Sequence, residues 1–425
     1  MKRRNFLLNT FSAAMSIPAI APAASRKEAK ETKPEPSAVE REAMPPDGLF
    51  SVKPHLQLMG ENAAAVVWMT RRKATGFVEW SQDGGATWTK TWTEEDGLLD
   101  AGCTLHRTIL SDFDPHKPLR FKICSQENPH IFPYRAEFKG DVQKMEFSLD
   151  PVLSGNGSVS FAMFNDVHQH LENYPKLLDL LPGPVNFSVF AGDIMNHVDD
   201  EASLSRYLLA PLSYVCTRTR AAMWYVRGNH ECRGPYSRKL RHYLALPDGH
   251  YFGAVTLGAA RFVFIDTGED KENSHREFEG IVDFDAYLER QMKWLKKEFA
   301  SDAWKSAKYR IAVMHIPPVG TKMLSGHVYN GESNRMRKMT ELLKTSELTI
   351  AFCAHTHRSG NDDARPDRPY VVITGGGNGA ATPERAHWFV DATITHCRYD
   401  ENELTVTQVN INGKKMFERR IKPFQ

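Results

Sequence analysis

The chain has 425 residues, of which 41% are hydrophobic and 25% charged, a composition typical of a soluble globular protein with a sizeable core. Its formal net charge is only +2, and three basic residues, Lys2, Arg3 and Arg4, lie at the very start. The remainder is therefore close to neutral, which argues against nucleic-acid or membrane binding through charge as the main role.

The N-terminus has the features of an export signal. A basic start precedes an apolar stretch over residues 6–21 and a run of small residues at 21–24 (APAA). Residues 3–8 (RRNFLL) resemble a twin-arginine export signal. We predict a signal peptide over residues 1–24 and a periplasmic or extracellular mature protein without a membrane span. An ordinary secretory signal and an uncleaved anchor are the alternatives.

Residues 25–47 are rich in Lys, Glu, Ala and Pro and show no apolar periodicity, so a disordered linker is predicted there. The chain has six cysteines, and none forms a Cys-x-x-Cys pair, which argues against a zinc knuckle. Cys103 and Cys124 could form a disulfide bond; buried free thiols are the alternative.

Residues 48–150 are predicted to be all-β. Apolar or alternating runs at 63–70, 76–80, 87–92 and 119–124 indicate short strands, and Asp83-Gly84-Gly85 is typical of a turn. Short alternating strands over about 100 residues favour a β-sandwich.

From residue 158 the pattern changes to strands that alternate with helices, which predicts a layered α/β domain. Strands are predicted at 159–164, 187–191, 223–226, 262–265, 310–314, 348–353 and 370–374, with two more at 393–398 and 404–410. Helices are predicted at 171–181, 201–215, 284–300 and 335–343. In such a domain, ligands bind outside the carboxyl ends of the strands.

Polar side chains follow five of these strands directly. They are Asp166 and His168, then Asp193, then Asn229 and His230, then His315, and finally His355 and His357. Any one of these alone is most often a turn residue or a structural histidine. Together they supply oxygen and imidazole ligands without cysteine, a mixture that indicates a dinuclear Mn, Fe or Zn hydrolytic site rather than a structural zinc.

The last pair is unusual for a strand end. In a continuing strand, His355 and His357 would lie on one face of the sheet. We therefore expect the chain to turn there and both imidazoles to point into a cleft.

The order Asp-x-His, Gly-Asp, Gly-Asn-His-Glu, His and His-x-His resembles that of the calcineurin-like metallophosphoesterase family, which includes the purple acid phosphatases. The resemblance implies an α/β (α+β) fold, a four-layer α/β/β/α sandwich over residues 155–425. Residues 48–150 resemble the fibronectin-III-like β-sandwich that precedes the catalytic domain in purple acid phosphatases.

The resemblance also implies roles for the polar residues. One metal would take Asp166, His168 and His357; the second would take Asn229, His315 and His355; and Asp193 would bridge both. His230 would not be a ligand but would face the substrate as a catalytic residue that donates a proton to the leaving oxygen or stabilises its charge. Glu231 or Asp266 could orient a ligand or His230 from outside the ligand set, and each could equally be a surface acid or a strand-end cap.

Two positions depart from the purple acid phosphatase pattern. Those enzymes carry a tyrosine ligand three residues after the bridging Asp, where this chain has Asn196. They lack a His ligand in the first motif, where this chain has His168. An Fe(III)-tyrosinate centre is therefore not expected.

The expected function is an exported phosphoesterase with two metal ions (Mn, Fe or Zn), in which a hydroxide that bridges the metals attacks a phosphomonoester or phosphodiester. A non-catalytic envelope binding protein and a metallohydrolase of a non-phosphate ester are the alternatives. His170, His197 and His327 lie near the motifs in sequence and are candidates for the rim of the site.

Overall fold

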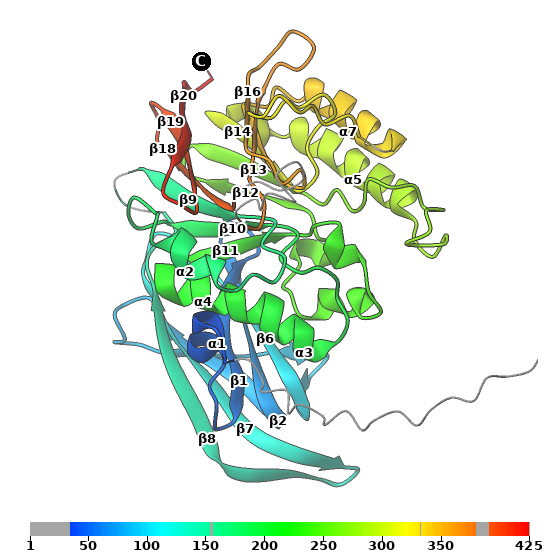
Figure 1. Cartoon of the computed structure of the whole chain (residues 1–425). Helices are drawn as coiled ribbons and strands as arrows, with labels where there is room; N and C mark the ends of the chain where they lie inside the picture. Colours follow the sequence, from blue (N-terminus) through cyan, green and yellow to red (C-terminus); the bar gives the residue numbers. More distant parts are fainter. Residues whose placement is uncertain (1–34, 154, 156, 332, 380–390, 425) are drawn as a thin grey trace, which may run out of the picture. The chain divides into compact units, whose positions relative to one another are not determined.

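The structure, a computed structural model, describes residues 35–424 except 154, 156, 332 and 380–390 (Figure 1). The predicted signal peptide and the first part of the predicted linker lie outside these residues. Residues 36–425 form one compact unit. Within the described residues, no helix combines the length and apolar character that a membrane span requires.

The prediction of a disordered linker over residues 25–47 is wrong for its last part. Helix α1 (Ala38–Ala43) begins with a capping box, in which the Ser37 side chain accepts from the Glu40 backbone N–H and the Glu40 carboxylate accepts from the Ser37 N–H. Val39 and Ala43 are fully buried in the same apolar cluster as helix α4 (Ala210–Thr219). A helix with only two buried apolar residues, one turn apart, is too short to produce a recognisable apolar periodicity in the sequence.

Two sheets carry the fold. The larger has the strand order β20-β19-β18-β9-β10-β11-β1-β2-β7-β8, with β3 and β6 also paired to β2, and the smaller has the order β12-β13-β14-β15-β17-β16. Strands β9, β10 and β11 are parallel to one another, as are β13, β14, β15 and β17. Polar residues at the carboxyl ends of these parallel strands can therefore gather at one edge of each sheet.

The larger sheet contains β1 (Phe50–Leu58), β2 (Ala63–Ser81), β3 (Thr89–Trp92), β6 (Cys103–Ser111), β7 (Leu119–Phe132), β8 (Arg135–Leu149), β9 (Val159–Phe164), β10 (Phe187–Ala191), β11 (Ala222–Val226), β18 (Thr393–Tyr399), β19 (Leu404–Asn410) and β20 (Lys415–Ile421). The smaller contains β12 (Gly253–Leu257), β13 (Ala260–Ile265), β14 (Tyr309–Met314), β15 (Ile350–Cys353), β16 (Gly360–Asp362) and β17 (Val371–Thr374). A separate pair is β4 (Glu94–Glu95) with β5 (Leu98–Leu99). The remaining α-helices among the described residues are α2 (Asn173–Leu178), α3 (Glu201–Leu204), α5 (Phe284–Phe299), α6 (Asp302–Ser306) and α7 (Asn334–Lys344).

Alternation along the buried strands divides the interior into layers. Odd-numbered residues of β9, such as Phe161, pack with Phe262 and Phe352 of the smaller sheet, which forms the core between the two sheets. Even-numbered residues such as Phe164 face the cluster with α1, α2 and α4. The outer face of the smaller sheet packs on α5, α6 and α7 (Figure 1). The predicted α/β class is therefore confirmed, with helices on the outer faces of two stacked sheets.

Residues 48–150, which are predicted to be all-β, contain strands β1–β8 and no helix. These strands do not stand apart from the rest, because β1 pairs in parallel with β11 and Leu56, Trp68 and Phe121 belong to the core between the sheets. The fibronectin-like sandwich and the domain boundaries stay predictions. All six cysteines are free, so Cys103 and Cys124 form no disulfide bond.

Candidate metal centre

The predicted ligands converge at the carboxyl ends of β9, β10 and β11 in one sheet and of β14 and β15 in the other. Two groups of carboxylate and imidazole atoms each gather within 4.8 Å of one another. The first group is Asp166, His168, Asp193 and His357, and the second is Asp193, His315 and His355. Asp193 belongs to both groups, as a bridging ligand would.

In the first group, the donor atoms face a common point. His168 Nε2 lies 2.9 Å from His357 Nε2, and His357 Nε2 lies 3.5 Å from Asp166 Oδ1. Asp193 Oδ2 lies 3.6 Å from His168 Nε2. Asp166 and Asp193 are fully buried, so a cation among these atoms would offset two buried carboxylates.

Asn229 joins the second group through its amide oxygen. That oxygen lies 3.0 Å from His315 Nε2, 3.1 Å from His355 Nδ1 and 3.2 Å from Asp193 Oδ2. The amide nitrogen instead faces Arg233 Nη2, another donor, at 2.9 Å. Once His315 is neutral, these four atoms all direct lone pairs at one point, where they repel one another without a cation and are satisfied by one, so the donor set fits a metal ion.

Five of the predicted ligands lie in the left-handed backbone region. Their φ values are 48° for Asp166, 48° for His168, 53° for Asp193, 69° for His355 and 52° for His357. The conformation costs L-residues about 1 kcal/mol or more each, and such strain clusters at functional sites. It also explains the unusual His-x-His, because the chain leaves β15 and directs the two rings to different groups.

Two glycines allow the turns after β10 and β11 to touch. A Cβ on Gly192, whose φ is +82°, would lie 2.6 Å from the Gly228 backbone, and a Cβ on Gly228 would lie 2.2 Å from the Asp193 backbone nitrogen. The Gly of Gly-Asp and the Gly of Gly-Asn-His-Glu are therefore steric requirements of the same contact.

Glu231 joins these two turns. Its fully buried carboxylate accepts backbone N–H bonds from Asp193 at 2.9 Å, Ile194 at 2.7 Å, Met195 at 2.9 Å and Gly228 at 2.9 Å. Burial raises the pKa of Glu231 to about 7, and these N–H donors oppose the shift. Glu231 thus positions the backbone that carries the ligands.

The histidine rings are oriented by hydrogen bonds at their second nitrogen. His315 Nδ1 lies 2.8 Å from the Ala191 carbonyl oxygen, which leaves Nε2 for the second group. His168 Nδ1 lies 3.0 Å from Asn196 Oδ1, and His355 Nε2 lies 3.1 Å from Asp270 Oδ2. Partners of this kind fix the tautomer and direction of metal-binding imidazoles.

Sequence reasoning missed Asp270 and its neighbours. Glu269 and Asp270 lie in the loop after β13, where no strand-end spacing marks them, and both are fully buried. Asp266, the other candidate for this role, pairs instead with Arg227 at 2.6 Å and accepts from the Tyr287 hydroxyl at 2.7 Å. Asp270 lies five residues beyond the end of β13, so its position in the sequence does not mark it as a partner of His355.

His230 lies beside the first group but outside both. Its Nδ1 lies 2.7 Å from the Asn196 carbonyl oxygen, and its Nε2 lies 3.9 Å from Asp193 Oδ2 and 3.3 Å from Arg233 Nη1. Burial lowers the pKa of His230, an effect that Asp193 opposes and Arg233 reinforces. His170 and His197 are half exposed and pair with Glu172 and Asp199.

In the metal-free centre, the pKa values of the predicted ligands are shifted in different directions. Burial lowers the pKa of His168 to about 4 and that of His357 to about 3. Burial alone would lower the pKa of His315, but the carboxylate of Asp193 and, more weakly, that of Asp166 raise it to about 10. Burial raises the pKa of Asp166 to about 7.

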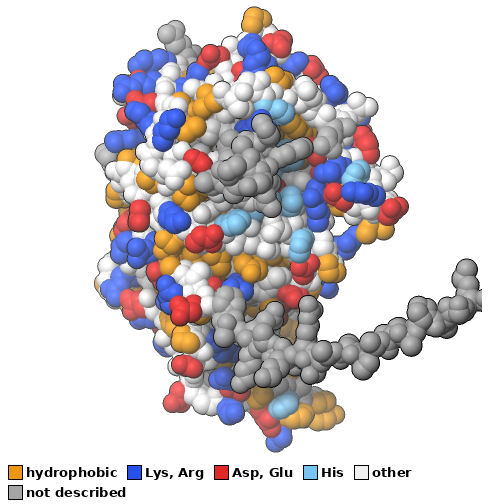
Figure 2. All heavy atoms as spheres, in the orientation of Figure 1, with side chains coloured by type: hydrophobic (Ala, Val, Ile, Leu, Met, Phe, Trp, Pro, Cys, Tyr) orange, Lys and Arg blue, Asp and Glu red, His pale blue; other side chains and the backbone are white. Residues whose placement is uncertain are grey.

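Figure 2 shows histidine side chains on one face, with acidic and basic side chains beside them.

Residues 159–359 match the family model of the calcineurin-like phosphoesterases. The chain thus carries a calcineurin-like phosphoesterase domain, and this domain contains every residue of both groups. No curated protein sequence matches the chain.

Two solved structures share the fold over most of the chain. A purple acid phosphatase from yellow lupin (Lupinus luteus) seeds is 14% identical, with a TM-score of 0.60 over 87% of this chain and 74% of that one. A structure of PhoD is 9% identical, with a TM-score of 0.59 over 88% of this chain and 92% of that one. At these identities the likeness shows the fold alone.

The first prediction separates the two groups. His357→Ala should remove the ion of the Asp166 group, and His355→Ala the ion of the His315 group, so each variant should hold about one ion where the parent holds about two. Elemental analysis after dialysis measures the ratio, and His170→Ala is the control. Unchanged metal content in either variant would contradict the assignment.

The second prediction concerns the protons that the histidine ligands release when metal binds. At pH 7, His168 and His357 are already neutral, whereas His315 with a pKa of about 10 must lose a proton before Nε2 can bind metal. Zn²⁺ binding should therefore release at least about one proton, and the apparent affinity should fall up to about tenfold per unit as pH decreases. Chelators should accordingly strip the metal faster at mildly acidic pH.

Calorimetric titration in two buffers with different ionisation heats measures the proton release. Equal apparent heats in both buffers would contradict metal binding at His315 Nε2.

Proposed function

We propose that the protein is an exported, dinuclear-metal-dependent phosphoesterase that hydrolyses phosphomonoesters or phosphodiesters. The observation that carries this proposal is the sharing of Asp193 between two ligand groups, both of which approach its Oδ2, at 3.6 Å from His168 Nε2 and 3.2 Å from His315 Nε2. A structural zinc site needs one closed group of four ligands and no shared carboxylate. The calcineurin-like phosphoesterase domain supports the same chemistry.

The ligand roles follow the two groups. Asp166, His168 and His357 would hold one ion, Asn229, His315 and His355 the other, and Asp193 both. Two ions held by these residues would make a nucleophilic water molecule more acidic and would offset the charge of a bound phosphate. The metals would be Mn, Fe or Zn, since the set mixes carboxylate, amide and imidazole donors without thiolate.

His230 would donate the proton that the leaving oxygen needs. Its Nδ1 is engaged by the Asn196 carbonyl, so Nε2 is the atom presented to the substrate. A phosphate dianion beside Nε2 would favour the imidazolium form and counter the effect of burial. Arg233, 3.3 Å away, would bind a phosphate oxygen at the same time.

Export is proposed from the sequence alone. The basic start, the apolar stretch and the small-residue run of residues 1–24 support it. We infer a periplasmic or extracellular protein with a mature chain that begins after residue 24.

The third prediction tests the activity. Purified protein reconstituted with Mn, Fe or Zn should hydrolyse chromogenic phosphomonoesters or phosphodiesters, and Asp193→Asn should lose activity by at least about 10²-fold because both ions lose a ligand. A panel that includes carboxylic esters separates the alternative of a non-phosphate ester hydrolase. Absence of all turnover with two ions bound would instead favour a binding protein.

The fourth prediction concerns His230. His230→Ala should lower kcat by about 10²-fold or more for alkyl phosphates, whose leaving oxygen needs a proton, and much less for 4-nitrophenyl phosphate, whose leaving group is stable as an anion. Steady-state kinetics on both substrates measure the difference, with His197→Ala as the control. An equal loss on both substrates would argue against proton donation by His230.

A further inference from the structure

We propose that an arginine-lined groove beside His230 binds a second anionic group, carried by the leaving group of the substrate; this inference rests on the proposed function. The arginine groove consists of two adjoining cavities of about 440 and 470 Å³. They share Arg227, Ser237, Arg238 and Tyr287, so they form one continuous depression.

Positive charge dominates the arginine groove. Its lining contains five arginines, namely Arg227, Arg233, Arg238, Arg241 and Arg290, and its acidic residues are Glu277 and Asp283. Both acidic residues line the first cavity; the second cavity is lined by four of the arginines and no carboxylate. Such a surface concentrates anions.

Two of the five arginines are paired with carboxylates, and the other three are not. Arg227 pairs with Asp266 at 2.6 Å, and Arg233 pairs with Glu269 at 2.8 Å and Glu277 at 3.1 Å. Arg238 donates to the Ile281 carbonyl oxygen at 3.0 Å, and Arg241 to the Gly249 carbonyl oxygen at 3.2 Å.

Among the described residues, Arg238, Arg241 and Arg290 form no ion pair, and all three are exposed. Neighbouring guanidinium groups without counter-charges repel one another, and a bound anion relieves that repulsion.

Arg233 connects the arginine groove to the proposed acid, His230. Arg233 lines the first cavity, and its Nη1 lies 3.3 Å from His230 Nε2, which is itself 3.9 Å from the shared Asp193. A leaving group that receives its proton at His230 therefore departs past Arg233 into the groove. The attacked phosphate and the second anionic group would lie on opposite sides of Arg233.

The aromatic residues that line the arginine groove fit an apolar or aromatic part of the substrate between its two anionic groups. Phe278, Phe284 and Tyr287 line the first cavity, and Tyr251 lines the second. The Arg227 guanidinium lies 4.2 Å from the Tyr251 ring centroid, which holds the aromatic wall in place. The substrate class that fits is a phosphoester whose alcohol carries another phosphate or a similar dianion.

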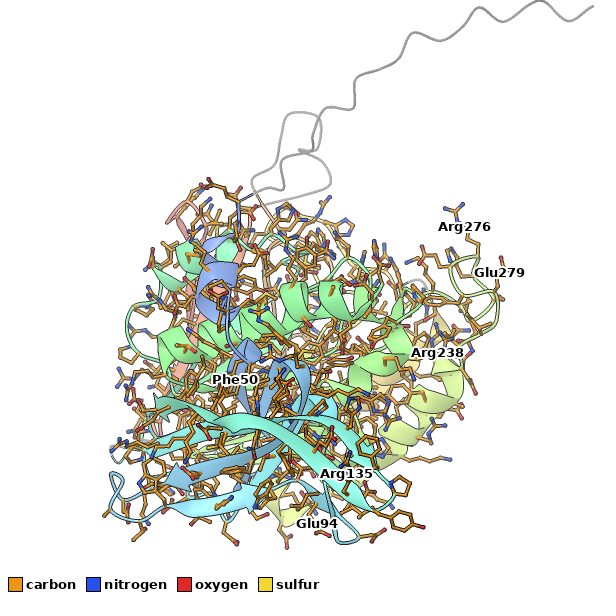
Figure 3. The ribbon with its side chains drawn as sticks, turned by 90° about the horizontal axis from the view of Figure 1, so that it is seen from below. Phe50, Glu94, Arg135, Arg238, Arg276 and Glu279 are labelled. Carbon is orange, nitrogen blue, oxygen red and sulfur yellow. The ribbon has the colours of Figure 1, made fainter. Side chains whose placement is uncertain are left out.

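Figure 3 shows Arg238 on the same side of the molecule as Arg276 and Glu279, which lie in the loop between β13 and α5. Arg276 is exposed but lines neither cavity. Arg276→Gln therefore removes the same charge from nearby without altering the arginine groove, and serves as the matched control.

The fifth prediction compares fructose 1,6-bisphosphate with fructose 6-phosphate. The metal-loaded protein should favour the bisphosphate in kcat/KM. Arg238→Gln and Arg241→Gln should each reduce that preference about tenfold, the effect of one lost charge-assisted contact. Arg238→Lys should restore part of it, and Arg276→Gln should leave it unchanged. An unchanged preference in both groove variants, or an equal loss in Arg276→Gln, would overturn the proposal.

A second measurement does not depend on turnover. Calorimetric titration of the metal-loaded protein with naphthalene-1,5-disulfonate, which cannot be hydrolysed, should give about tenfold weaker binding to Arg238→Gln than to the parent and to Arg276→Gln. Equal binding to all three would overturn the arginine groove even if phosphoesters are hydrolysed. The expected binding pattern without any ester hydrolysis would support the groove and refute the proposed function.

Discussion

One buried carboxylate, that of Glu231, determines the geometry on which the candidate centre depends. It accepts N–H bonds from three consecutive residues after β10 and from Gly228 after β11, so the two turns cannot move independently. The Asp193 side chain completes the link by accepting from the His230 N–H at 2.9 Å. A buried carboxylate costs several kcal/mol unless it is hydrogen-bonded, and here its oxygens are satisfied by backbone donors alone. The arrangement places the shared ligand and the proposed acid on one rigid unit.

The same rigidity makes the left-handed ligands tolerable. Asp166, His168, Asp193, His355 and His357 all adopt positive φ, at a combined cost of several kcal/mol. The surrounding bonds hold them there, since the Asp166 carboxylate accepts from the His355 N–H at 3.0 Å and the His168 N–H donates to the Asp193 carbonyl at 3.0 Å. These bonds cross between the sheets and between neighbouring turns. The free energy of metal binding would offset the cost of this backbone strain, which in the metal-free protein lowers the stability of the folded state.

Much of the centre could be predicted from sequence because its ligands follow recognisable buried strands. The runs before Asp166, Asp193 and His315 are mostly apolar and buried along their whole length, and the parallel α/β pattern brings their carboxyl ends together. Asp270 and Arg233 could not be assigned in this way, because their roles arise from contacts between loops. Helix α1 was missed because only two buried residues mark it, and the pairing of β1 with β11 was missed because strand partners distant in sequence leave no local pattern.

Asn196 shows how a change at one position is matched elsewhere in the centre. Purple acid phosphatases, which the sequence resembles, have a tyrosine ligand at this position and no histidine ligand in the first motif. Here the shorter Asn196 side chain lies 3.0 Å from His168 Nδ1, so it orients an imidazole whose Nε2 faces the first group. Its carbonyl oxygen lies 2.7 Å from His230 Nδ1. One residue thus orients both a proposed ligand and the proposed acid, and the side of the centre that faces the arginine groove depends on it.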